Sequence, residues 1–126
     1  MTPINFEQVK DRLAPAMKGG AGQIKREIKR GVAMCYQTSN GKVFAVVRPE
    51  GQELVFVAVA GAGLAHVAHE FVFFAKMKGF KSIRYHTKNP HFLAKGVNAL
   101  SVKPQLIEVR NAMFGNNEYI YRIKIQ

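Results

Sequence analysis

The sequence predicts a mixed α/β fold: a mostly antiparallel central sheet with one parallel strand–helix–strand unit and flanking helices. Segments with the two-residue alternation of strands are interleaved with segments whose apolar residues recur every three or four positions. Leu54 to Val59 is apolar throughout, which is typical of a central strand covered on both faces. A helix and another strand, Ser82 to Thr87, follow it, and this order implies a parallel pair. With 126 residues, 48% of them hydrophobic, the chain is expected to form a single domain over residues 1–126.

Two helices are expected at the start of the chain. Asn5 is a suitable N-cap for a helix that reaches about Met17. Pro15 would strain that helix if it continued much further. A short basic helix, Gln23 to Arg30, is expected next, anchored by two isoleucines four residues apart.

A hairpin is expected after these helices. Val32 to Thr38 and Val43 to Val47 have the composition of strands, and Asn40-Gly41 between them is a strong signal for a tight hairpin turn. Pro49-Glu50-Gly51 predicts a second turn before the central strand. Three strands are therefore expected to be joined in antiparallel order.

The second half of the chain predicts a helix, a strand, a shorter helix and two final strands. The long helix is expected to begin at Leu64 and end near Gly79, a natural terminator. Asn89-Pro90 is a helix start signal, and that helix is expected to reach about Ala99. The last two strands are expected at Gln105 to Arg110 and Tyr119 to Ile125.

Charge is the unusual property of the composition. Nineteen Lys and Arg residues against eight Asp and Glu residues give a formal net charge of +11. A field of this kind attracts polyanions such as nucleic acid, anionic lipid or a phosphorylated ligand, although a basic cluster is also often just a solvated surface. The candidate residues for binding nucleic acid or another anion are Lys25, Arg26, Lys29, Arg30, Lys76, Lys78, Lys81, Arg84 and Lys88.

Other features limit the classes of function. Cys35 is the single cysteine, so no intramolecular disulfide can form, and it is expected to be a buried, inert thiol. The sequence has no signal-peptide core and no apolar run near the roughly 20 residues of a membrane span, so a cytoplasmic location is expected. His66, His69 and Glu70 lack the spacing of a zinc motif and are expected on the solvent side of the long helix, so no metal is expected.

The middle of the chain resembles the GNAT superfamily of N-acetyltransferases. The run from Val57 to Leu64 resembles the Gly-rich loop of that family, which receives the pyrophosphate of coenzyme A. Ala75 to Lys81 is similar to the family's helix end, and Lys95-Gly96-Val97 is similar to its Lys-x-Gly-Phe run. The resemblance implies a GNAT fold, acetyl-CoA as the cofactor and a cofactor site formed by Val59, Gly61, Ala62, Gly63, Leu64 and Asn89.

The sequence also departs from the family pattern. The loop usually has Arg or Gln three residues before its first glycine, where this chain has Ala58. The tyrosine that often serves as general acid has no counterpart between Pro90 and Leu100. The residues available for proton transfer are Glu53, at the start of the central strand, and His86, whose imidazole exchanges protons near neutral pH.

Two functions are therefore expected. The first is acyl-CoA-dependent N-acetylation of an amine acceptor. The alternative is a GNAT-like protein without chemistry, binding nucleic acid or an acidic protein partner through its basic surface. Small basic proteins of this kind resemble accessory or virion proteins of bacteriophages, for which the location would be the host cytoplasm or the virion.

Overall fold

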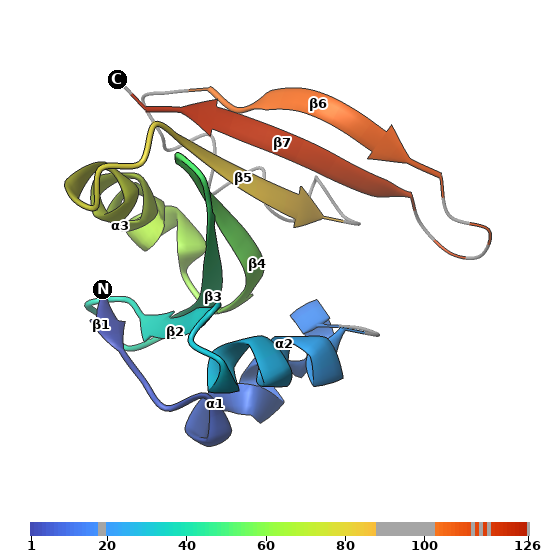
Figure 1. Ribbon diagram of the computed structural model, residues 1–126. Coiled ribbons are helices and arrows are strands. Elements are labelled where there is room, and N and C mark those ends of the chain that lie inside the picture. The colour runs from blue at the N-terminus through green and yellow to red at the C-terminus, as the bar shows by residue number, and fades with distance from the viewer. Residues whose placement is uncertain (18–19, 88–102, 112, 114, 116, 126) are drawn as a thin grey trace.

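A computed structural model describes the chain except for residues 18–19, 88–102, 112, 114, 116 and 126 (Figure 1). In the described part, one seven-stranded sheet has the order β1-β2-β3-β4-β5-β7-β6. Only β4 and β5 are parallel, and the other neighbouring strands are antiparallel. The strands are β1 (Thr2–Pro3), β2 (Met34–Gln37), β3 (Val43–Glu50), β4 (Glu53–Gly61), β5 (Ser82–Thr87), β6 (Gln105–Arg110) and β7 (Glu118–Lys124).

The helices are α1 (Phe6–Leu13), a 3-10 turn η1 (Ala14–Met17), α2 (Ala21–Lys29) and α3 (Leu64–Met77). The predicted fold class is confirmed, as is the order of the described elements. The helix predicted after Asn89-Pro90 lies outside the described residues. The short strand β1, which pairs with β2, is an addition that the sequence did not indicate.

The first helix begins as predicted. The side chain of Asn5 accepts a hydrogen bond of 3.0 Å from the backbone N–H of Glu7. The regular α-helix, however, ends at Leu13, and the segment up to Met17 forms a 3-10 turn. Pro15 explains this difference, because its ring is sterically incompatible with the carbonyl four residues earlier in a continuing α-helix.

The hairpin between β2 and β3 forms around Asn40, as predicted. The Asn40 side-chain oxygen accepts hydrogen bonds from the Thr38 hydroxyl at 2.7 Å and the Lys42 backbone N–H at 3.0 Å. The turn predicted at Pro49-Glu50-Gly51 is wrong in its position. Strand β3 continues through Glu50, which pairs with Glu53, and the turn is at Gly51 and Gln52.

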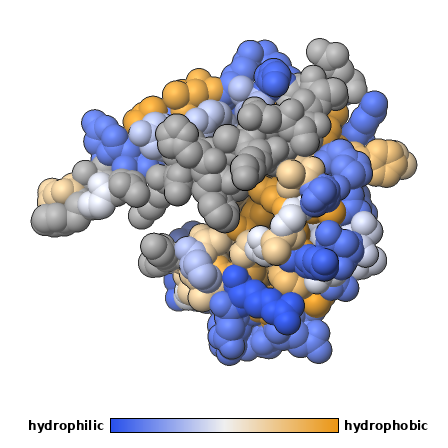
Figure 2. Space-filling model, turned by 180° about the vertical axis from the view of Figure 1, so that it is seen from behind, coloured by the Kyte–Doolittle hydropathy of each residue, from blue (hydrophilic) through white to orange (hydrophobic). Residues whose placement is uncertain are grey.

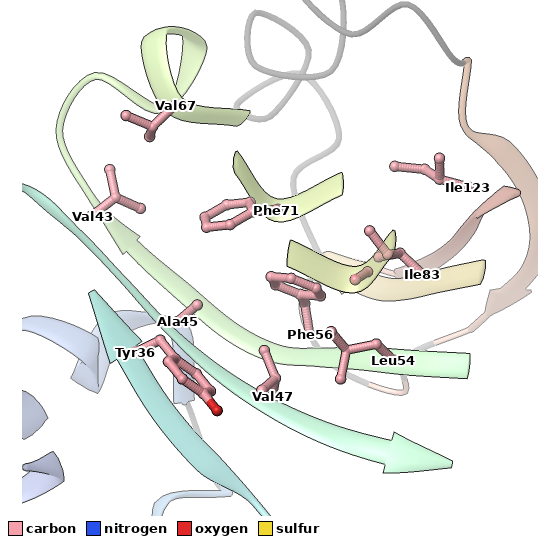
Figure 3. Packing of buried hydrophobic residues seen from close by; sticks show 11 residues of the cluster. Tyr36, Val43, Ala45, Val47, Leu54, Phe56, Val67, Phe71, Ile83 and Ile123 are labelled. Atoms are coloured by element: carbon pink, nitrogen blue, oxygen red, sulfur yellow. The ribbon is translucent and has the colours of Figure 1, made fainter. Parts of the chain in front are cut away.

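Helix α3 covers one face of the sheet, and α1 and α2 cover the other (Figure 1). Figure 3 shows Phe71 of α3 pointing toward the sheet residues of this layer. Its ring centre lies 5.0 Å from that of Phe56 on β4. The buried cluster between α3 and the sheet contains Tyr36, Val43, Ala45, Val47, Leu54, Phe56, Val67, Phe71, Ala75, Ile83 and Ile123.

The opposite face of the sheet forms a second buried cluster with α1 and α2. Ala58 belongs to this cluster, whereas Leu54 and Phe56 belong to the first. Strand β4 is thus covered on both faces, as its continuous apolar sequence predicts. The second cluster contains Phe6, Val9, Leu13, Met17, Ile24, Ala33, Cys35, Phe44, Val46 and Ala58.

Candidate functional site

The two parallel strands separate toward their C-terminal ends. Pairing between β4 and β5 runs from Glu53–Ser82 to Phe56–Tyr85 and, in the described part of the chain, goes no further. The next residue of β4, Val57, is a β-bulge: Val46 and Val47 of β3 face Ala58 and Phe56, and Val57 has no counterpart. A bulge bends its strand, and Figure 1 shows β4 and β5 diverging toward their arrowheads. We call this divergence the splay.

The loop at the end of β4 lies directly on the β2–β3 hairpin. The backbone N–H of Ala62 donates a 3.2 Å hydrogen bond to the carbonyl oxygen of Lys42. A Cβ atom on Gly61 would lie 2.0 Å from the same oxygen and 2.7 Å from the Cα atom of Val43. Only glycine therefore allows this approach of two backbones, which fixes where the loop begins.

Helix α3 begins with free backbone donors. Gly63 is the N-cap residue in a left-handed conformation (φ 79°), and it offers no side-chain oxygen to the helix. Among the described residues, no acceptor contacts the backbone N–H groups of Gly63, Leu64 or Ala65. The first turn also has no acidic residue. This helix end therefore suits an anion, because it combines unpaired donors with the positive end of the helix dipole.

Most of the residues predicted to bind the cofactor lie together at this end of β4. Val59 packs against the cluster under α3, and the run from Gly61 to Leu64 forms the loop and the start of the helix. Asn89, the remaining member of the predicted set, lies outside the described residues.

Ala58, the residue at the family's Arg or Gln position, is 4% exposed and packs in the cluster beneath α1. In this chain a small apolar residue therefore contributes to the core at that position.

Glu53 is bound on several sides and is poorly suited to accept a proton. Its carboxylate accepts hydrogen bonds from Arg122 at 2.5 and 3.1 Å, Ser82 at 2.7 Å and Arg84 at 3.0 Å. Hydrogen bonding to Arg122, followed by the other donors, lowers the pKa of Glu53 to about 2 against the opposing effect of burial. Glu53 also lies at the start of β4, roughly 25 Å along the strand from Gly61. Its contacts favour a structural role.

His86 occupies the splay itself. It is the first residue of β5 beyond the parallel pairing with β4. Its ring Nδ1 lies 2.6 Å from the carboxylate of Glu118 on β7, and its Nε2 accepts a 3.3 Å hydrogen bond from Arg84. The side chain is 27% exposed, so it is accessible to a second molecule. Of the two residues predicted for proton transfer, His86 has the more suitable position.

Glu118 and Arg122 are site residues that the sequence did not indicate. Both lie on β7, on the same face of the sheet as Arg84 and His86. Two-residue alternation could have placed each pair on one face of its own strand. It could not have shown that β7, rather than β6, is the neighbour of β5.

Arg84 belongs to an ion-pair network and is not part of a free basic surface. Its guanidinium bonds to Glu53 at 3.0 Å and to both carboxylate oxygens of Glu50 at 3.0 Å. Glu50 also binds Arg48, which reaches Glu27 of α2 at 2.7 Å. The network neutralises Arg84, so Arg84 does not fit its predicted role in binding nucleic acid.

The other candidate basic residues form two clusters on opposite faces of the sheet. Lys25, Arg26, Lys29 and Arg30 lie on α2 and its C-terminal cap, whereas Lys76, Lys78 and Lys81 lie at the end of α3 and just after it. All seven are exposed. The lower part of the molecule, where Figure 1 places α1 and α2, is largely hydrophilic in Figure 2. Lys88 lies outside the described residues, and binding of nucleic acid through this set stays a prediction.

His66 and His69 are exposed on α3, as expected. Glu70 accepts hydrogen bonds of 3.1 and 3.3 Å from the backbone N–H of Ser39 and so ties the hairpin to the helix. Over the described ranges, no group of three His, Cys, Asp or Glu side chains could hold a metal ion. None of the described helices is both long and apolar enough for a membrane span.

Solved structures of acetyltransferases have the same fold. An acetyltransferase from Bacillus subtilis in complex with CoA matches with a TM-score of 0.68 and 12% identity, over 98% of this chain and 95% of that one. The aminoglycoside 6'-N-acetyltransferase from Enterococcus faecium matches with a TM-score of 0.59 and 9% identity, over 99% and 96%. The ribosomal-protein-S18-alanine N-acetyltransferase from Escherichia coli matches with a TM-score of 0.57 and 11% identity, over 75% and 70%.

The chain therefore has the GNAT fold, as the sequence resemblance implied. Its sequence matches no protein-family model and no curated protein.

Proposed function

We propose that this protein is an acyl-CoA-dependent N-acyltransferase. One observation carries the proposal: the splay between β4 and β5 ends at a helix N-terminus whose backbone donors are free among the described residues. Solved structures of the same fold were obtained with CoA, from Bacillus subtilis, and with acetyl-CoA, from Salmonella typhimurium. Function does not follow from fold alone, so the proposal depends on the geometry of the splay and of the N-terminus of α3.

The residues at the splay fit coenzyme A. The N–H groups of Gly63, Leu64 and Ala65 are suited to hold its pyrophosphate. Among the described residues, pairing between β4 and β5 ends at Phe56–Tyr85, and the extended pantetheine arm would lie between the two strands beyond that point. The +11 net charge of the chain favours such a polyanion at long range.

The chemistry needs one proton acceptor near the splay. The cofactor supplies an acyl group activated as a thioester. The amine acceptor arrives as an ammonium ion, so it must lose a proton before its nitrogen can form the new bond to the acyl carbon. The carbon–sulfur bond then breaks, and the thiolate that leaves takes up the second proton that the nitrogen loses. His86 is the described residue placed to take the first proton at Nε2, and the remaining rate enhancement comes from positioning.

An acyl-transfer assay tests the proposal. Acetyl-CoA is mixed with the protein and a panel of amines, including an aminoglycoside and a peptide with a free N-terminal alanine, and release of the free CoA thiol is followed. We expect release that depends on both protein and amine, and that falls at least about 100-fold in His86→Gln, a loss typical of a missing general base. No amine-dependent release from protein that binds acetyl-CoA would contradict the proposal.

A further inference from the structure

His86 and Glu118 come from neighbouring antiparallel strands. His86 pairs with Ile120, so Glu118 lies two residues before that partner in β7, on the same face and diagonal to His86. Their side chains meet at 2.6 Å while remaining 27% and 31% exposed. The two side chains therefore contact each other where a second molecule can reach them.

The neighbours of the His86 ring determine which nitrogen carries the proton. An ionised carboxylate only accepts hydrogen bonds, and an arginine guanidinium only donates them. Nδ1, which faces Glu118, must therefore carry the hydrogen, and Nε2, which faces Arg84, must present its lone pair. The remaining charged group beside this pair in the described chain is Arg110 on β6, 3.9 Å from Glu118.

The contact that occupies Nε2 is weak enough to be replaced. The distance from Arg84 Nε to His86 Nε2 is 3.3 Å, near the limit for a hydrogen bond. The other donors of Arg84 are held by Glu50 and Glu53 at 3.0 Å. An ammonium group can therefore take the place of Arg84 at Nε2 without leaving that guanidinium unpaired.

We infer that Glu118 is a positioning residue that holds His86 as the Nδ1–H tautomer, with the Nε2 lone pair directed at the amine acceptor. This inference rests on the proposed function. When Nε2 takes a proton from the ammonium, Nδ1–H remains bonded to Glu118, and the carboxylate stabilises the imidazolium that forms. In this geometry Glu118 is not the group that first takes the proton from the ammonium, because its carboxylate contacts the ring at Nδ1, on the side away from Nε2.

The first test is the 15N NMR spectrum of the imidazoles, which requires no catalysis. The His86 signals are identified by their loss in His86→Gln. We expect the Nδ1–H tautomer in the wild-type protein and in Glu108→Gln, a control that removes a glutamate paired with Arg110 on the neighbouring strand. We expect a mixture of tautomers in Glu118→Ala. An Nε2–H tautomer in the wild-type protein, or an unchanged spectrum in Glu118→Ala, overturns the inference and leaves the proposed function standing.

The second test separates kcat from KM. Glu118→Ala is expected to lower kcat about tenfold or more with little change in the KM for acetyl-CoA, because Glu118 acts through His86 and not on the cofactor. Glu118→Gln, whose side-chain oxygen can still accept from Nδ1–H, should recover part of the loss. An unchanged kcat in an active Glu118→Ala protein overturns the inference.

Discussion

Glu53 and Arg122 are 69 residues apart in the sequence and form a two-point ion pair, with distances of 2.5 and 3.1 Å. The same carboxylate binds Ser82 and Arg84, so a single side chain of β4 holds β5 and β7. These contacts lie at the end of the parallel pair remote from the splay. Strands β4 and β5 are therefore held together by Glu53 at one end, and they separate at the other.

Glu53→Gln should make the protein less stable at neutral pH. The pKa of Glu53 in the folded state is about 2, below its ordinary value, so its stabilising effect is full above pH about 5 and is lost as the pH falls toward 2. Removing the charge leaves Arg122 without its carboxylate partner and Arg84 with Glu50 alone, which we expect to cost about 3 kcal/mol at pH 7.

Urea denaturation at several pH values measures this effect. The difference between wild-type and Glu53→Gln proteins should shrink between pH about 5 and 2. Glu7→Gln is the control, because Glu7 pairs with Lys10 on the exposed surface and should matter little. Equal stability of the wild-type and Glu53→Gln proteins at pH 7 would show that these ion pairs of Glu53 contribute nothing to stability.

Truncation of two phenylalanines on α3 should affect stability to very different extents. Phe71 is 9% exposed and packs on Phe56, whereas Phe73 is 62% exposed. Phe71→Ala should lower the free energy of unfolding by about 3–4 kcal/mol, and Phe73→Ala should change it by less than about 0.5 kcal/mol. Thermal or urea unfolding checks both, and similar losses for the two variants would mean that the face of α3 is wrongly assigned.

Alanine substitutions at two glycines with positive φ distinguish the cost of backbone strain from the cost of a steric clash. A Cβ at Gly51 (φ 61°) would meet nothing within 4 Å, so Gly51→Ala should cost only about 1 kcal/mol of conformational strain. At Gly61 the Cβ would collide with the Lys42 backbone, so Gly61→Ala should cost about 3 kcal/mol or more. Equal unfolding free energies for the two variants would refute this contact between the loop and the hairpin.

Cys35 should be unreactive in the folded protein. Burial raises the pKa of its thiol to about 11, so roughly one molecule in a thousand carries the reactive thiolate at pH 8. A chromogenic disulfide reagent should show no reaction over minutes in buffer and one thiol per chain in denaturant. Rapid labelling under native conditions would mean that the strand β2 opens readily.

Much of the fold could be predicted from local pattern. Alternation, the Asn40-Gly41 turn and the apolar run of β4 indicate most elements, because these signals act over a few residues. Pro49-Glu50-Gly51 predicts a turn, but Pro49 pairs with Leu54 and the turn comes after Glu50. Local signals do not show how far a strand continues.

The candidate site was only half predictable. The glycines at 61 and 63 mark the loop, because their conformations depend on residue type. The partners of Glu53 and His86 come from β7, so identifying them required the sheet order and register. Without that register, Glu53 looked like a free base and Arg84 like a free cation, although they bind each other.

The most direct test of the account is a calorimetric titration of acetyl-CoA into the wild-type protein, Ala65→Glu and Ala65→Gln. Ala65 is exposed in the first turn of α3. A glutamate there should stabilise the helix by about 0.3–1 kcal/mol through its dipole, yet repel a phosphate. We expect micromolar binding to the wild-type and Ala65→Gln proteins, and binding weakened about tenfold or more in Ala65→Glu without any loss of thermal stability. Absence of binding to the wild-type protein at millimolar acetyl-CoA, or equal affinity in all three proteins, would contradict a cofactor site at the start of α3.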